Sequence, residues 1–350
     1  MAQYYNPNNI LQTKDLNKKT PEIFFIEGNR GSGKTFAFKT KLIRDFLNGK
    51  GKFAVLVRFQ YEITDYENIF FKDIGPIKFP EYKMTSKMIG KGLFNELFLN
   101  DESCGYVIAI NSADTIKKYS STFVDVNQIW FDEFQSENNK YCPDEVNKFI
   151  SIHTSIARGA KNGGHIRYVP VYLTSNRVST INPYYLNLDI TNRIAPNAKI
   201  IKGDGWVLEI SQLQEVADEI SNSAFGKAFK DSKQINYSIG KKVLLDNNNF
   251  IEKQKGEKYI LTNLKYKNKE FGLWRMEKTG LLYCDTKPVS DVSTISIYND
   301  DHTNSTWLLE DGQVFGGLMK KSYELGIVRF ESIECKNAFL QFVKIKDMNK

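Results

Sequence analysis

One short segment of this sequence has the residue types and spacing of a phosphate-binding loop. The pattern G-x-x-x-x-G-K-[ST] is matched at every fixed position by Gly28, Asn29, Arg30, Gly31, Ser32, Gly33, Lys34 and Thr35. In such a loop the glycines let several backbone N–H groups point at one phosphate chain, the lysine neutralises phosphate oxygens, and the hydroxyl binds Mg²⁺. An apolar run at 23–26 precedes the loop, and apolar residues at helical spacing follow it. The sequence therefore predicts a strand, the loop, and a helix whose N-terminus faces a nucleotide.

Two further groups of polar residues follow apolar strands. Asp132 and Glu133 come directly after the apolar run at 126–131. We expect Asp132 to hold Mg²⁺ through water and Glu133 to polarise the attacking water, because γ-phosphate cleavage needs an oriented nucleophile. Asn176 ends the next predicted strand and is favoured as a sensor of the γ-phosphate or of the attacking water. The alternative is that Thr174-Ser175-Asn176 only starts a turn. The base-reading element N-K-x-D of GTPases is absent, which favours ATP.

Phosphoryl transfer also calls for a cation besides Lys34. Arg30 lies inside the loop and can act within its own subunit. Arg158 ends the helix predicted after Pro143 and can reach a neighbouring subunit, and Lys117-Lys118 is a second candidate for that role. The structural alternative for Arg158 is a cation that stabilises the C-terminal end of its helix.

The order of predicted elements indicates an α/β protein with two domains in 350 residues. Strands and helices alternate up to residue 204, as in an ATPase domain with a mostly parallel sheet. Residues 205–245 are read as a linker and residues 246–350 as an α+β domain. Further strands are predicted at 52–58, 105–110, 126–131 and 165–174, an antiparallel meander at 258–266, 271–276 and 281–285, and a last helix from Glu331.

Composition limits the cellular setting and the partners. Lys and Arg exceed Asp and Glu by 48 − 41 = +7, which weakly favours a polyanionic partner. No run of eighteen apolar residues is present, and the N-terminus lacks the blocks of a secretory signal, so we expect a cytosolic protein without membrane contact. The basic excess gathers in one region, at Lys227, Lys230, Lys233, Lys241, Lys242, Lys253, Lys255, Lys258, Lys265, Lys267 and Lys269.

The sequence resembles the genome-packaging ATPases of small protein-primed podophages, which are related to the large-terminase motors. The loop, the Asp132-Glu133 strand and the strand ending at Asn176 carry the likeness together with Tyr5-Asn6-Pro7, Val57-Arg58, Asn182-Pro183-Tyr184, Phe271-Gly272-Leu273-Trp274 and Gly280-Leu281-Leu282-Tyr283-Cys284-Asp285. The likeness spans nearly the whole chain. Its most particular signal is the last pair of segments.

The resemblance implies a homomeric ring, expected to be a pentamer, that docks on the portal vertex of a prohead in the host cytoplasm. It implies that ATP hydrolysis drives double-stranded DNA inward and that a prohead RNA is a further partner, which the lysine-rich region can serve. By position, Arg158 matches the trans-acting arginine finger and Glu133 the catalytic glutamate. The C-terminal domain is expected to be RNase H-like, with a vestigial nuclease site.

The residues themselves also argue against nuclease activity. A two-metal nuclease needs clustered carboxylates, yet the predicted strand at 258–266 contains no acid. The acids that remain possible metal ligands, but are unpaired, are Asp285, Asp291, Asp300 and Asp301.

Two other functions remain open at this stage, a helicase-like nucleic-acid-stimulated ATPase and a nucleotide-gated nucleic-acid-binding scaffold. DNA contacts are expected in loops after the second strand or between Gly75 and Gly92. That second stretch carries Lys78, Lys83, Lys87 and Lys91. Tyr5 can stack on adenine or seal the edge of a core.

Overall fold

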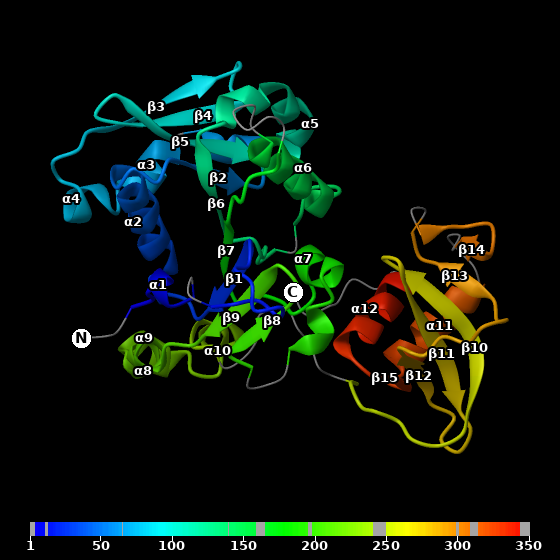
Figure 1. Cartoon of the computed structure of the whole chain (residues 1–350). Coiled ribbons are helices and arrows are strands. Elements are labelled where there is room, and N and C mark those ends of the chain that lie inside the picture. The colour runs from blue at the N-terminus through cyan, green and yellow to red at the C-terminus, as the bar shows by residue number, and fades with distance from the viewer. Residues whose placement is uncertain are drawn as a thin grey trace. The chain divides into compact units, whose positions relative to one another are not determined.

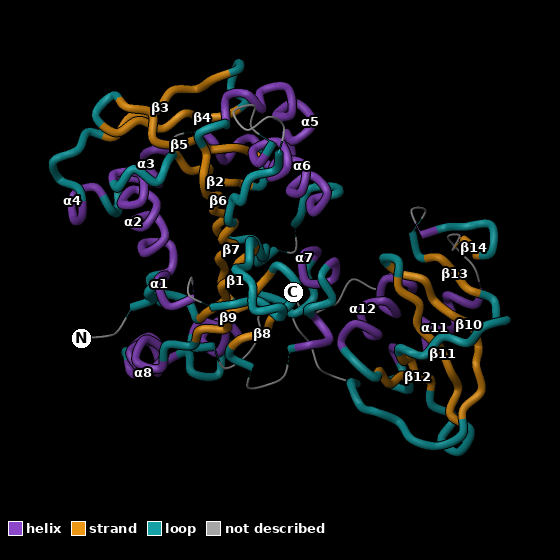
Figure 2. The backbone as a smooth tube through the Cα atoms, in the orientation of Figure 1, coloured by secondary structure: helices purple, strands orange, loops and turns teal. Residues whose placement is uncertain are grey.

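The computed structural model describes residues 4–10, 13–64, 66–138, 140–158, 165–194, 198–240, 250–298, 301–308 and 314–343. The chain divides into two compact units, Met1–Leu245 and Asp246–Lys350. Each unit has its own sheet and its own hydrophobic core, drawn in Figure 1 by position in the chain and in Figure 2 by secondary structure.

The first unit is built on a nine-stranded sheet in the order β3-β4-β5-β2-β6-β7-β1-β9-β8. The six central strands of this order, which are β5, β2, β6, β7, β1 and β9, run parallel to one another. The strands β3, β4 and β8 pair antiparallel at the two edges of the sheet. The strands are β1 (Ile23–Gly28), β2 (Lys52–Val57), β3 (Met84–Ile89), β4 (Phe94–Leu99), β5 (Glu102–Ala109), β6 (Val126–Asp132), β7 (Val171–Asn176), β8 (Ile200–Lys202) and β9 (Trp206–Ser211).

Helices cover both faces of this sheet, because alternate residues of the parallel strands are apolar on both sides. On one face Phe38 and Leu42 of α2 pack over Ile26, and on the other Phe149 and Ile152 of α6 belong to a second core. The α-helices are α1 (Pro7–Ile10), α2 (Lys34–Leu47), α3 (Tyr66–Phe71), α4 (Gly75–Lys78), α5 (Ala113–Ile116), α6 (Glu145–Ala157), α7 (Pro183–Asn187), α8 (Gln214–Asn222), α9 (Ala224–Ala228) and α10 (Lys233–Ser238).

The structure differs from the sequence-based expectation in several places. The strand predicted at 165–174 begins only at Val171. Residues 206–211, assigned to a linker, form β9, which pairs with β1 over its whole length. Within the stretch between Gly75 and Gly92, where a loop was expected, residues 84–89 form β3, the edge strand of the β3–β4 hairpin. Residues 241–245 of the expected linker, including Lys241 and Lys242, lie outside the described residues.

The second unit is an α+β fold whose sheet runs β14-β13-β10-β11-β12-β15. The predicted meander is present as three antiparallel strands, and β13 and β14 extend the sheet in parallel with β10. The elements are β10 (Lys258–Tyr266), β11 (Lys269–Met276), β12 (Leu282–Asp285), β13 (Thr294–Ser296), β14 (Thr306–Leu308), α11 (Val314–Glu324), β15 (Val328–Phe330) and α12 (Ile333–Phe342). The fold class predicted from the sequence is confirmed. Among the described residues, none of the helices has the length and apolarity to cross a membrane.

Candidate active site

The phosphate-binding loop, residues 28–35, joins the end of β1 to the start of α2. Gly31 and Gly33 adopt the left-handed backbone, with φ of 76° and 82°, which glycine reaches without steric cost. At Gly28 a Cβ atom would lie 2.6 Å from the carbonyl oxygen of Ser211, so β9 leaves room only for glycine. The loop therefore has the backbone that the sequence pattern predicts, and α2 begins at Lys34.

Lys34 is folded back into the loop. Its Nζ donates hydrogen bonds to the carbonyl oxygen of Asn29 at 3.1 Å, to Oγ of Ser32 at 3.0 Å and to Oδ1 of Asn176 at 3.5 Å. Burial lowers the pKa of Lys34 to about 8, and the carboxylates of Asp132 and Glu27 oppose that shift. The ammonium group is thus held by neutral acceptors at the place where a phosphate chain would supply charged ones.

The hydroxyl of Thr35 and the carboxylate of Asp132 lie together at the ends of α2 and β6. Thr35 Oγ1 donates to Asp132 Oδ2 at 2.8 Å, and Thr174 Oγ1 donates to Asp132 Oδ1 at 2.6 Å. Trp130 in turn donates its indole N–H to Thr174 Oγ1 at 2.9 Å. Hydroxyl and carboxylate oxygens are the ligands that Mg²⁺ uses together with water and substrate phosphates, so this pair fits the ion. Thr174 is a positioning contact that the sequence did not single out.

Glu133 sits on a tight turn directly after β6. Its backbone is left-handed, with φ of 53°, and its N–H donates to Asp132 Oδ1 at 3.1 Å. The residue is exposed, yet partial burial of its carboxylate, followed by the charges of Asp132 and Glu137, raises the pKa of Glu133. Arg30 and Arg58 act in the opposite direction. A carboxylate with a raised pKa beside the metal-binding group is suited to accept a proton from water.

Arg58, which follows β2, forms hydrogen bonds with the backbone of this turn. Its guanidinium donates to the carbonyl oxygen of Phe134 at 2.7 Å and reaches that of Glu133 at 3.4 and 3.5 Å. Its Nε pairs with Glu145 at 2.8 Å, and its guanidinium carbon lies 5.0 Å from the ring of Tyr141. Arg58 is only 8% exposed. No role for Arg58 was predicted from the sequence, although a charged residue at the end of an apolar strand is a signal that could have marked it.

A buried polar network lies beneath the loop. Gln135 donates to Glu27 of β1, and Gln135 Oε1 accepts the N–H groups of Val178 and Ser179 at 3.0 and 2.8 Å. Arg177 Nε lies 3.7 Å from the second oxygen of Glu27. The network joins the strand before the loop to the segments that follow Glu133 and Asn176. Its residues are far apart in the sequence, which is why the sequence did not reveal it.

Known proteins share this arrangement of elements. The family model described as podovirus DNA encapsidation protein (Gp16) matches residues 1–347. The chain belongs to this family. Over 351 aligned residues it is 25% identical to the DNA packaging proteins of Bacillus phage PZA and Bacillus phage phi29, and each alignment covers 98% of both chains. The solved bacteriophage phi29 viral genome packaging motor assembly has the same fold, with a TM-score of 0.70 and 23% identity over 97% of this chain and 100% of that one. The resemblance inferred from the sequence is confirmed.

The two arginines expected to act on ATP lie in different settings in this encapsidation protein. The side chain of Arg30 is 56% exposed, and its guanidinium lies 3.9 Å from Glu137. Arg158 caps the C-terminal end of α6 and is exposed. Arg158 and Lys117 line one pocket of about 400 Å³ together with hydroxyl groups of α6. Lys117 also pairs with Asp114 at 3.3 Å. The two candidates for a trans-acting cation thus share a surface, whereas Lys118 is not among the residues that line it.

The structure also places the lysines that were expected to contact DNA, and Tyr5. Lys78, Lys83, Lys87 and Lys91 are all exposed, on α4 and along the β3–β4 hairpin. Charged side chains on an edge strand also prevent sheet-to-sheet pairing, so exposure alone does not make them DNA contacts. Tyr5 is 7% exposed, stacks on Phe38 and donates its hydroxyl to Glu209 at 3.0 Å. Of the two readings of Tyr5, the core-sealing one therefore agrees with the structure.

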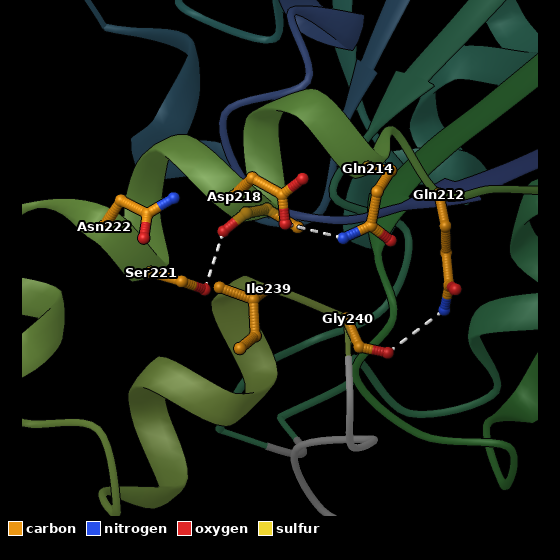
Figure 3. A pocket seen from close by; sticks show the side chains of 8 residues that line it. Gln212, Gln214, Asp218, Ser221, Asn222, Ile239 and Gly240 are labelled. Carbon is orange, nitrogen blue, oxygen red and sulfur yellow. Dashed lines mark hydrogen bonds between the residues drawn. The ribbon is translucent and has the colours of Figure 1, made fainter.

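The segment that follows β9 is part of the site. Asn29 of the loop exchanges two hydrogen bonds with the backbone of Leu213, at 3.1 and 3.2 Å. Beyond Leu213, α8 and the residues after α10 enclose a pocket of about 320 Å³, across which Gln212 donates to the carbonyl oxygen of Gly240 at 3.0 Å (Figure 3). The residues assigned to a linker thus pack directly against the phosphate-binding loop.

Proposed function

We propose that this member of the encapsidation family is the ATPase subunit of a viral DNA-packaging motor. The observation that carries the proposal is the meeting of Thr35 with Asp132, which puts the loop, the metal-binding oxygens and Glu133 at one edge of a parallel sheet. Ligands bind at this edge in open α/β sheets, outside the carboxyl ends of the strands. The names of the phi29 and PZA relatives as DNA packaging proteins supply the biological setting.

In this proposal each side chain has one task. The amides of residues 28–33 and the Lys34 ammonium bind the phosphates of ATP, Thr35 and Asp132 hold Mg²⁺, and Glu133 orients the attacking water. Mg²⁺, when bound, neutralises charge on the β- and γ-phosphate oxygens. Asn176 reads the γ-phosphate. Arg58 holds the backbone of the turn that places Glu133 directly after Asp132.

Two variants separate nucleotide binding from hydrolysis. We expect Lys34→Ala to abolish nucleotide binding, and Glu133→Gln to bind ATP and release phosphate at least 100-fold more slowly, because only the water-orienting step is lost. Phosphate release is then compared on blunt duplex and on single-stranded DNA. Stimulation by duplex supports a packaging motor, and preferential stimulation by single strands supports a helicase. No phosphate release under any condition supports a binding scaffold.

The ring and its partners are also part of the proposal. We propose a homomeric ring, with five subunits expected, that docks on the portal of a prohead in the host cytoplasm and uses prohead RNA as a further partner. Arg158 acts in trans on the neighbouring ATP, with Lys117 beside it. Arg158→Ala is expected to lose DNA-stimulated turnover and to recover part of it when mixed with Lys34→Ala, because a mixed ring contains intact interfaces. Mixed rings no more active than either parent contradict this arrangement.

We propose that the second unit has no nuclease activity. Asp285 is 2% exposed, pairs with Lys258 and accepts the indole N–H of Trp274 at 2.8 Å. Asp301 accepts two backbone N–H groups of the β10–β11 turn, at 2.7 Å each. Both carboxylates are therefore engaged in structural contacts, whereas a nuclease keeps its acids for metal ions. Asp300 lies outside the described residues. Incubation of supercoiled DNA with the protein and Mn²⁺ is expected to leave the DNA uncut.

A further inference from the structure

Gln60, two residues after Arg58, is hydrogen-bonded at both ends of its side-chain amide. Its Nε2 donates to the carbonyl oxygens of Gly92 and Leu93, the latter at 3.2 Å, and its Oε1 accepts the hydroxyl of Ser112 at 2.6 Å. Carbonyl oxygens only accept hydrogen bonds, so these partners fix which end of the amide is the donor. The half-buried side chain thus ties the segment after β2 to the turn of the β3–β4 hairpin and to the residues after β5.

On the side of the candidate active site, a single residue separates Gln60 from Arg58. The carbonyl oxygen of Arg58 accepts the N–H of Asn111 at 3.2 Å, and its guanidinium donates to the carbonyl oxygen of Phe134 at 2.7 Å. Consecutive Cα atoms stay about 3.8 Å apart, so a shift of the backbone at Gln60 also moves that of its neighbours. Such a shift reaches the turn that carries Glu133 through the guanidinium of Arg58.

On the other side, the segment from Ser112 to Tyr119 carries Lys117, which lines the pocket of about 400 Å³ together with Arg158. Ser112 precedes the short helix α5, and Lys117 follows it directly. Tyr119 lies against the hairpin turn, because a Cβ atom at Gly90 would be 3.2 Å from its hydroxyl oxygen. Both ends of this segment are therefore held, one by the amide of the glutamine and the other by the hairpin turn.

Resting on the proposed ring, we infer that Gln60 is a positioning residue that transmits the occupancy of the neighbouring subunit's nucleotide site to the catalytic turn. ATP in the neighbouring site attracts Lys117 and Arg158, because phosphate oxygens are strong acceptors for both cations. The segment 112–119 moves with Lys117, and the doubly bonded amide carries this movement to Arg58. A subunit whose cations face an empty site consequently hydrolyses its own ATP slowly, although its own site is complete. The size of the effect is a coupling free energy between two sites, which turnover in mixed rings measures.

The test mixes full-length active protein with increasing fractions of Lys34→Ala and measures phosphate release in the presence of duplex DNA. The Lys34→Ala subunit keeps Lys117 and Arg158, so it serves its neighbour's chemistry while its own site stays empty. Without the coupling, each such subunit removes only its own turnover, whereas with it the neighbour that faces the empty site is silenced as well. In equal mixtures, random assembly therefore leaves about one half of the unmixed turnover without the coupling and about one quarter with it. We expect about one quarter for the unchanged protein and about one half when the active subunit is Gln60→Met, which keeps the length of the side chain but not its hydrogen bonds.

Ser112→Ala is a second variant, because it removes only the hydroxyl that donates to Gln60, and it is also expected to leave about one half. The matched control is Ser86→Ala, which removes an acceptor of Asn95 at 3.2 Å within the same hairpin and should keep the steep loss. An unchanged protein that retains about one half, or either relay variant at about one quarter, overturns the role of Gln60. Failure of the proposed function has a different signature. In that case the unmixed protein releases no phosphate, or native mass spectrometry finds no mixed oligomers, and the relay falls with it.

Discussion

Arg58 offers the sharpest test of how the catalytic turn is held. Its guanidinium is paired with Glu145, which is 3% exposed, and it bonds the backbone around Glu133. Arg58→Met leaves the Glu145 carboxylate buried without its cation. Removing one partner of a buried ion pair costs about 3 to 5 kcal/mol, against a typical free energy of unfolding of about 5 to 15 kcal/mol. The variant is expected to fold, with a urea midpoint well below that of the unchanged protein.

A second substitution separates stability from catalysis. Glu145→Gln removes the unpaired charge and keeps an acceptor for the N–H of Cys142 or the hydroxyl of Tyr184, which contact Glu145 at 2.9 and 3.0 Å. The double variant Arg58→Met/Glu145→Gln is therefore expected to regain about 2 kcal/mol of stability relative to Arg58→Met alone. The carbonyl groups of Glu133 and Phe134 still lack their donor, so the turn stays loose.

Turnover is the readout that decides between the two roles. A displacement of about 1 Å at a reacting group can cost about 100-fold in rate, and we expect kcat to fall by that order in both variants with little change in KM. Urea unfolding followed by circular dichroism gives the stability, and phosphate release at saturating ATP gives kcat. A double variant that recovered turnover along with stability would show that Arg58 only supports the fold, and the positioning argument would be wrong.

Four further predictions concern the loop and the second unit. Because burial lowers the pKa of Lys34 to about 8 and phosphates favour its charged form, ATP binding near pH 8 should take up protons and weaken as the pH rises further, which calorimetry in buffers of different ionisation enthalpy measures. The lowered pKa of Lys34 also affects stability. The free energy of unfolding should rise as the pH increases from about 8 to the pKa that Lys34 has in the unfolded chain, because in this range the unfolded chain binds more protons than the folded protein. Gly28→Ala places a Cβ 2.6 Å from the Ser211 carbonyl oxygen, so it should cost about 1 to 3 kcal/mol in urea unfolding and at least about tenfold in ATP affinity. Lys258→Met should lower the free energy of unfolding by about 3 kcal/mol by leaving Asp285 buried without its cation, and Lys258→Arg should retain most of it.

The sequence predicted those parts of the site whose contacts belong to one local motif. The loop of residues 28–35 and the strand-end pair Asp132-Glu133 are recognisable because backbone geometry and residue type coincide within a few positions. Arg58 escaped prediction because its role depends on partners 75 to 87 positions away. The hydrogen bond between Tyr237 and Glu137 escaped prediction for the same reason, since the two residues are 100 positions apart. A pairwise contact of this kind follows from the strand order, which a single sequence does not specify.

The segments whose secondary structure was predicted wrongly were missed for a different reason. Residues 206–211 alternate apolar and polar types only briefly before a long basic and polar stretch, and that stretch dominated their interpretation as a linker. Their pairing with β1 is a tertiary contact that overrides local texture. The β3–β4 hairpin at 84–99 carries exposed lysines and no strong turn signal apart from glycines, so β3 was interpreted as part of a loop. In both cases an edge or near-edge strand gained its identity from its neighbour.

The charged groups of the candidate site are paired within the protein, and under the proposed function this determines how ATP binds. Lys34 is bonded to three protein acceptors, and Asp132 accepts three protein donors. Binding of ATP therefore exchanges existing hydrogen bonds for new ones, and the net free energy comes from the extra strength of charged partners rather than from filling unmet groups.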